Sequence, residues 1–163
     1  MDERLESNVK ILRVLYAVFF LLLVISCILT LNNWLPSKLN FLGDLTVFLC
    51  MYGYLPITAI IYGSLCYIKT EDIMIPSLLY GLWYVLVAII AFFFGMIGGA
   101  GYDFAGTNDW WVGVSLFVFL SVDLFFWIKL PLLVVLSIVS GLITKLIVSK
   151  KRAKKVIQQS DDI

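Results

Sequence analysis

Asp123 is the acidic residue that lies deepest within an apolar stretch of this chain, and Lys129 follows it in the same stretch. Ionisable side chains inside a bilayer are costly to bury, so they usually mark a functional site. On one unbroken helix, Lys129 would lie about 9 Å along the axis and about 120° round from Asp123, too far for a direct pair. We expect Lys129 to extend to the nearer membrane interface. Three roles stay open for Asp123: a structural hydrogen bond to Ser121, Ser137, Ser140 or a tyrosine of the run 45–68, binding of a proton or cation, or contact with another protein.

Few other residues have the chemistry of a reactive centre. The chain contains no histidine, and Cys27, Cys50 and Cys66 each lie inside an apolar run without a neighbouring cysteine at metal-ligand spacing. These absences argue against most zinc, haem and histidine-based acid–base sites, so we predict no catalytic residue, no metal site and no cofactor. Paired aspartates, a Ser–His dyad and an HExxH motif are also missing, which argues against an intramembrane protease. We therefore predict that the protein is not an enzyme.

The composition places these residues in a membrane protein. Hydrophobic residues make up 62% of the 163 residues and charged residues 14%, compared with about 25% charged in a soluble domain. A net charge of +1 gives no indication of a nucleic-acid partner. Five apolar runs approach or exceed the roughly 20 residues that a helix needs to cross a bilayer. The predicted fold is all-α, a polytopic integral membrane helical bundle in one domain (1–163), with helices at about 11–31, 45–68, 73–97, 112–128 and 132–148 and a basic tail at 149–163.

The number of crossings depends on residues 112–148. One helix of this length would measure about 55 Å, well beyond the ~30 Å hydrocarbon core, so two spans joined by a tight turn at Lys129-Leu130-Pro131 are favoured. This gives five transmembrane helices. The positive-inside rule favours the alternative of four, with both tails cytoplasmic, because every basic residue except Lys38 then lies inside. Four crossings would leave the apolar run 132–148 in the cytoplasm at a high solvation cost, so five remain favoured.

Two stripes of small residues indicate close contacts between helices, which in lipid depend on small side chains. One stripe lies in the run 73–97 and the other in the run 132–148, and we expect the two to pair. A shorter pair, Ala59 and Gly63, follows a predicted kink at Pro56, where nearby tyrosines could line a small cavity or simply pack. The glycine-rich stretch 95–101 is predicted to form a flexible outer loop. The two stripes consist of Ser77, Gly81, Ala88, Ala91 and Gly95, and of Ser137, Ser140, Gly141 and Thr144.

Basic residues are concentrated after the last apolar run. They are typical of a cytoplasmic flank that attracts anionic lipid head groups, at about 1 kcal/mol per residue. We expect a multi-pass protein of the cell (plasma) membrane with a cytoplasmic C-terminus. The stripes favour a function through helix–helix contacts, as accessory subunit of a membrane complex or immunity-type protein, with a membrane-protein partner or a second copy. The alternative is a proton- or cation-conducting transporter or channel that uses Asp123. The basic residues are Lys150, Lys151, Arg152, Lys154 and Lys155.

Overall fold

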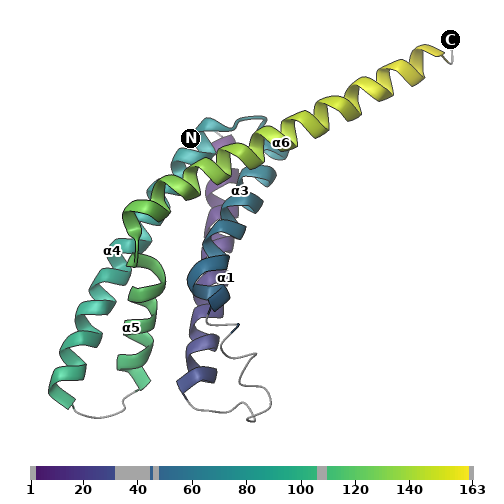
Figure 1. The fold of residues 1–163 in the computed structure, drawn as a ribbon. Helices are drawn as coiled ribbons and strands as arrows, with labels where there is room; N and C mark the ends of the chain where they lie inside the picture. Colours follow the sequence, from purple (N-terminus) through teal and green to yellow (C-terminus); the bar gives the residue numbers. More distant parts are fainter. Residues whose placement is uncertain (1–2, 32–44, 46–47, 106–109, 162–163) are drawn as a thin grey trace.

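The computed structural model describes residues 3–31, 45, 48–105 and 110–161, and the regular elements in this part of the chain are all helices (Figure 1). The all-α prediction is confirmed at this level. The predicted run 45–68 forms a π-helical turn followed by an α-helix, and the last helix continues through the predicted basic tail to Asp161. In chain order the elements are α1 (Glu3–Leu31), η2 (Leu49–Gly53), α3 (Tyr54–Thr70), α4 (Met74–Ala105), α5 (Trp110–Asp123) and α6 (Phe126–Asp161).

Three of these helices are long and apolar enough to cross a membrane. The spans lie at Glu3–Ile25 in α1, Met74–Ile97 in α4 and Phe126–Ala153 in α6. By contrast, α3 has 17 residues and α5 has 14, so neither reaches the roughly 20 residues of a complete crossing by itself. The structure thus supports a helical bundle with three membrane-compatible helices, and the five predicted spans are not all present as separate long helices.

The interruption between the last two helices lies earlier than predicted. Instead of turning at Lys129-Leu130-Pro131, the chain turns at Leu124 and Phe125, and Pro131 lies inside α6. Phe125 has a left-handed φ of 61°, a conformation that bulky residues rarely adopt and that ends α5. The N–H groups of Ile128 and Lys129 both donate to the Phe125 carbonyl, at 2.9 Å each, and so close the first turn of α6. The prediction of a turn at Pro131 was wrong because the backbone breaks at Phe125, six residues before the proline.

The glycine-rich stretch is also not a loop. Helix α4 continues through residues 95–101 as far as Ala105. At Gly95 an added Cβ would lie 2.6 Å from the ring of Phe119 in α5, so the glycine permits a close approach of the two helices. The prediction of a flexible loop was therefore wrong. The stretch is helical, and at least one of its glycines, Gly95, packs closely against α5.

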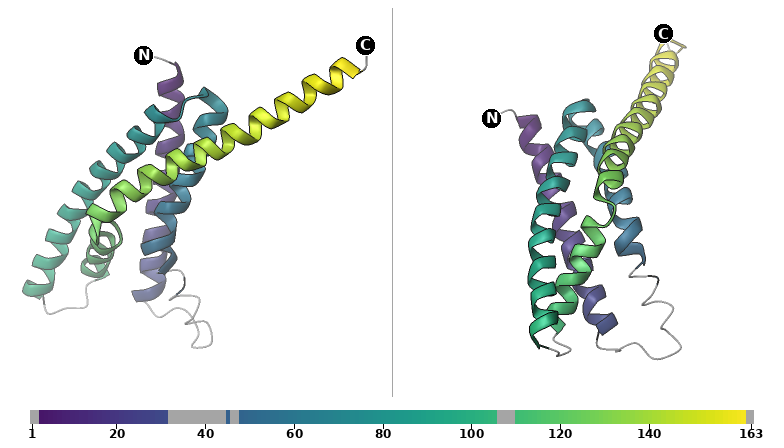
Figure 2. Two further views of the ribbon diagram at one scale, coloured as in Figure 1. Left: turned by 45° about the horizontal axis from the view of Figure 1, so that its top comes forward. Right: turned by 60° about the vertical axis from the view of Figure 1, so that its left-hand side comes forward.

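The helices alternate in direction, except at the last connection. Figures 1 and 2 show α1 and α4 running one way, α3 and α5 running the other, and α6 continuing in the direction of α5 after a bend. The N- and C-termini consequently lie at the same end of the bundle, and the C-terminal part of α6 extends beyond it. At this end Arg152 forms an ion pair with Glu71 at 2.6 Å. Its hydrogen bond and positive charge hold the pKa of Glu71 below the ordinary value of 4.5.

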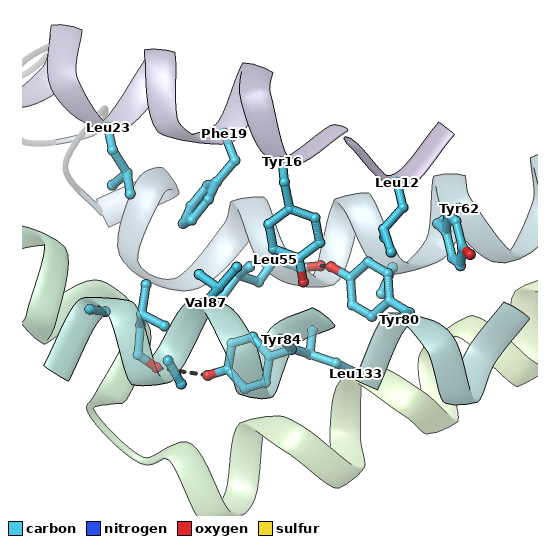
Figure 3. Packing of buried hydrophobic residues seen from close by; sticks show 14 of the residues in the cluster. Leu12, Tyr16, Phe19, Leu23, Leu55, Tyr62, Tyr80, Tyr84, Val87 and Leu133 are labelled. Carbon is cyan, nitrogen blue, oxygen red and sulfur yellow. Dashed lines mark hydrogen bonds between the residues drawn. The ribbon is translucent and has the colours of Figure 1, made fainter. Parts of the chain in front are cut away.

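The core is rich in tyrosine, whereas the outer surface of the helices is aliphatic. Tyr16, Tyr62, Tyr80 and Tyr84 from three helices are buried together with aliphatic side chains (Figure 3). Large apolar residues such as Leu78 and Leu82 are well exposed on the outside of α4. Polar groups inside and apolar groups outside suit a bundle surrounded by lipid. Besides the tyrosines, the core contains Leu12, Phe19, Leu23, Leu55, Ala59, Cys66, Val87, Ala88, Ala91, Val118, Val122 and Leu133.

Candidate intramembrane polar site

Asp123 and Lys129 lie on the two sides of the break between α5 and α6. Asp123 is the last residue of α5, and Lys129 lies in the first turns of α6. Lys129 Nζ reaches back across the break and donates to the Ser121 carbonyl at 2.8 Å. Its ammonium group therefore meets the negative end of the α5 dipole, at the end of the helix where Asp123 lies. The break thus directs the ammonium group toward the end of α5, whereas the sequence predicted that Lys129 extends to a membrane interface.

Tyr84 of α4 contacts residues on both sides of this break. Its hydroxyl donates to the Val122 carbonyl at 2.7 Å, and its ring stacks on that of Phe126 with centroids 5.6 Å apart. Tyr84 lies close to the middle of the apolar span Met74–Ile97. The break, with Asp123 and Lys129 beside it, therefore lies at about half the height of the bundle and far from either end.

A second helix irregularity faces Lys129. Before Pro56 the chain forms the π-helical turn η2, in which the N–H of Tyr54 donates to the Leu49 carbonyl. Proline cannot donate a backbone hydrogen bond, which accounts for a disturbed turn at this place. Lys129 Nζ lies 5.8 Å from the centre of the Tyr52 ring, within range of a cation–π interaction. Between the irregular turn and α6 lies a cavity of about 120 Å³, lined by Tyr52, Leu55, Pro56, Lys129, Leu132 and Leu133.

One polar atom near the middle of the bundle, Asp123 Oδ2, is buried and has no hydrogen-bond partner among the described residues. Two of the serines considered as partners for Asp123 bond elsewhere, since Ser140 donates to the Ile60 carbonyl and Ser137 accepts from Ser77. Buried polar groups without partners are rare and call for an explanation, such as water or a proton-transfer role.

The small-residue stripes pack inside the chain, with a different pairing from the one predicted. Ser77 of α4 does contact α6, through a 3.0 Å hydrogen bond to Ser137, and Gly81 faces Val134. Ala88 and Ala91 are buried in the core, and Gly95 faces α5. The tightest approach to the α6 stripe comes instead from α3, where an added Cβ at Gly63 would overlap the carbonyl of Ser137 and the hydroxyl of Ser140. The remaining members of the α6 stripe are Gly141, which lies against Ile73 and the Gly63 carbonyl, and Thr144, which donates to the Ser140 carbonyl.

The basic residues near the C-terminus lie on the part of α6 that extends from the bundle. Lys150, Lys151 and Arg152 are exposed, and Arg152 contacts Glu71. The side chains of Lys154 and Lys155 lie outside the described part of the structure. These residues are far along α6 from Lys129, so the charged end of the helix and the charged site at its start are separate features.

Sequence reasoning found Asp123, Lys129 and the Pro56 kink but did not place Lys129 beside either of the other two. It also missed Tyr84, although its spacing of four residues from Tyr80 would place both on one face of a helix. No protein family, curated protein or solved structure matches this chain. The geometry of the interrupted helices is therefore the basis for a functional proposal.

Proposed function

We propose that this protein is a multi-pass membrane protein that binds and releases a proton at Asp123 during proton-conducting or proton-coupled transport. One observation carries the proposal: the Asp123 carboxylate lies at a helix break in the middle of the bundle, and its Oδ2 atom is buried without a hydrogen-bond partner among the described residues. Interrupted helices at the middle of a membrane are a recurring feature of ion and substrate sites in transporters.

The surroundings of Asp123 favour a proton over a metal cation. The Lys129 ammonium already occupies the carbonyl end of α5, through its hydrogen bond to the Ser121 carbonyl. A sodium or potassium ion at this place would be repelled by the ammonium group and would need several additional oxygen ligands. A proton needs only the carboxylate, and the fixed positive charge of Lys129 stabilises the ionised form between two protonation events.

In this proposal the chain crosses the membrane four times. The crossings are α1, then η2 with α3, then α4, and finally α5 with the first part of α6. The common end of the two termini supports this arrangement. It also brings Arg4, Lys10 and Lys69 to the same end as the basic residues of α6, and the positive-inside rule then makes this end cytoplasmic in a cell membrane. The five-crossing alternative would require α5 and α6 to run antiparallel.

A proton-flux measurement tests the proposal. The purified protein is reconstituted into liposomes that contain a pH-sensitive dye, and a potassium gradient with valinomycin supplies the driving force. We expect the wild-type protein to acidify or alkalinise the vesicles faster than empty liposomes do, and Asp123→Asn to abolish this flux. Glu3→Gln, a change of an exposed acid at the start of α1, is the matched control and should retain it. Wild-type flux no greater than that of empty liposomes would overturn the proposal.

A function through helix–helix contacts with a second membrane protein or a second copy is supported less by the structure than by the sequence alone. The small-residue stripes that motivated it are occupied within the chain. What still favours it is the apolar face of α6, where Val135, Leu142 and Leu146 are exposed on the side away from the bundle. Anionic lipid head groups remain the proposed partners of Lys150, Lys151 and Arg152.

A further inference from the structure

The cavity between η2 and α6 combines one positive charge with apolar walls. Leu55 and Leu133 are at most 3% exposed and close its inner side. Tyr52 and Leu132 are nearly half exposed and lie at its opening. Lys129 is half-buried and is the one charged residue among the described side chains that line the cavity. The carboxylate of the proposed proton site is not part of the lining, so the two sites are distinct.

The Lys129 ammonium group can donate more hydrogen bonds than it makes. It carries three N–H groups, and among the described residues its hydrogen-bond acceptor is the Ser121 carbonyl, at 2.8 Å. The Tyr52 ring lies 5.8 Å from Nζ and attracts the charge through its π face. Neither of the ion pairs within the described part of the chain includes Lys129. A charge taken out of water is costly unless a partner in contact balances it, so an anion beside Nζ would lower this cost.

The size and the walls of the cavity limit which anion fits. Its volume is about 120 Å³, and an apolar cavity of about 150 Å³ is large enough for benzene, so the space suits an anion of about six non-hydrogen atoms or fewer. A doubly charged phosphate or sulfate would need several donors, whereas the described lining supplies one cation. Chloride would make no use of the leucine and proline walls. A monocarboxylate with a short alkyl chain uses both the charge and the walls.

We infer that this cavity binds a short-chain monocarboxylate, with the carboxylate at Lys129 Nζ and the alkyl chain against Leu55 and Leu133. The carboxylate accepts hydrogen bonds from the ammonium group, and the chain leaves its polar surroundings for the aliphatic inner wall. Because the opening lies between the exposed residues Tyr52 and Leu132, the ligand enters from the side of the bundle and not from either end. The inference goes beyond the proposed proton site and does not depend on it.

Ligand-observed NMR of the purified full-length protein in detergent tests the inference, with butyrate as the probe and empty micelles as the reference. n-Butanol has a similar alkyl chain but no charge. We expect the wild-type protein to bind butyrate about tenfold or more tightly than n-butanol, as a charge-assisted hydrogen bond predicts. Lys129→Met should lower the affinity for butyrate about tenfold or more, to the level of n-butanol. Lys145→Met, a change of an exposed lysine on the same helix, should alter it by less than about twofold.

A second pair of variants keeps the test valid if Lys129→Met does not fold. Leu132→Trp leaves the ammonium group in place but fills the opening, and it should abolish butyrate binding. Leu142→Trp adds the same ring at an exposed position farther along α6 and should retain binding.

Three results would overturn the inference. They are butyrate binding that persists in Lys129→Met or Leu132→Trp, wild-type affinity for butyrate no higher than for n-butanol, and displacement of butyrate by an equal concentration of chloride, which would indicate a site for any anion. Proton flux is measured separately, so absent butyrate binding with a flux that Asp123→Asn abolishes would overturn this inference and leave the proton site intact. Intact butyrate binding without flux would support the cavity and overturn the proton site alone.

Discussion

At the scale of single residues, Lys129 is the group on which the polar site depends. Its ammonium group donates to the Ser121 carbonyl near the end of α5, lies against the Tyr52 ring and carries a positive charge across the helix break from Asp123. A buried carboxylate that loses its counter-charge is more costly than a pair of neutral groups in the same place. The two residues should therefore behave as one unit when they are substituted.

A double-mutant cycle tests this coupling. We expect Lys129→Met to lower the free energy of unfolding in detergent by about 1.5–3 kcal/mol, the range for a hydrogen bond to a charged group. Adding Asp123→Asn should recover part of the loss, because the unbalanced carboxylate is removed. Lys145→Met, a change of an exposed lysine on the same helix, serves as the control and should have little effect. Strictly additive effects of the two substitutions would show that Asp123 and Lys129 do not interact.

At the scale of helices, the sequence predicted which residues would lie inside but not how the chain would turn. Apolar runs and small-residue stripes define helix faces, and Ser77, Gly81, Ser137, Ser140 and Gly141 are indeed buried. Which helix meets which face depends on the whole assembly, so the role of Gly63 opposite Ser137 could not be derived from spacing. The break at Leu124 and Phe125 contains no proline or glycine that would have predicted it. Instead, Tyr84 of the neighbouring helix α4 contacts the residues on both sides of the break.

The contact between α3 and α6 gives an element-scale prediction. Gly63→Ala places a methyl group against the backbone carbonyl of Ser137, which cannot rotate away, and should destabilise the protein by about 1–3 kcal/mol. Gly81→Ala should cost less, because the atom it meets, at 2.8 Å, is the end of the Val134 side chain. Gly53→Ala meets only the flexible Leu49 side chain, at 3.2 Å, and is the control. Melting temperatures of the three purified variants give the order, and a Gly63→Ala variant as stable as Gly53→Ala would show that α3 and α6 do not pack this closely.

At the scale of the whole molecule, the direction of α6 decides how the charged groups lie in the membrane. The two predictions from sequence disagreed because apolar length favoured five crossings and charge favoured four. The proposed interrupted crossing would resolve the conflict, because α6 continues in the direction of α5 after a bend and then extends beyond the bundle. The apolar residues 132–148 belong to α6, whose first part packs in the bundle and whose later part extends beyond it. In this proposed arrangement Asp123 and Lys129 would lie near the middle of the bilayer.

Labelling of single cysteines from the two sides of sealed vesicles tests this arrangement most directly. Ser7→Cys, Gly101→Cys and Ser149→Cys are introduced separately into a chain whose three native cysteines are replaced by alanine, and a membrane-impermeant maleimide is applied from one side or the other. We predict that positions 7 and 149 react from the same side and position 101 from the opposite side. Reaction of positions 7 and 149 from opposite sides would contradict the interrupted crossing. The proposal that Asp123 is a proton site at mid-membrane would then fail with it.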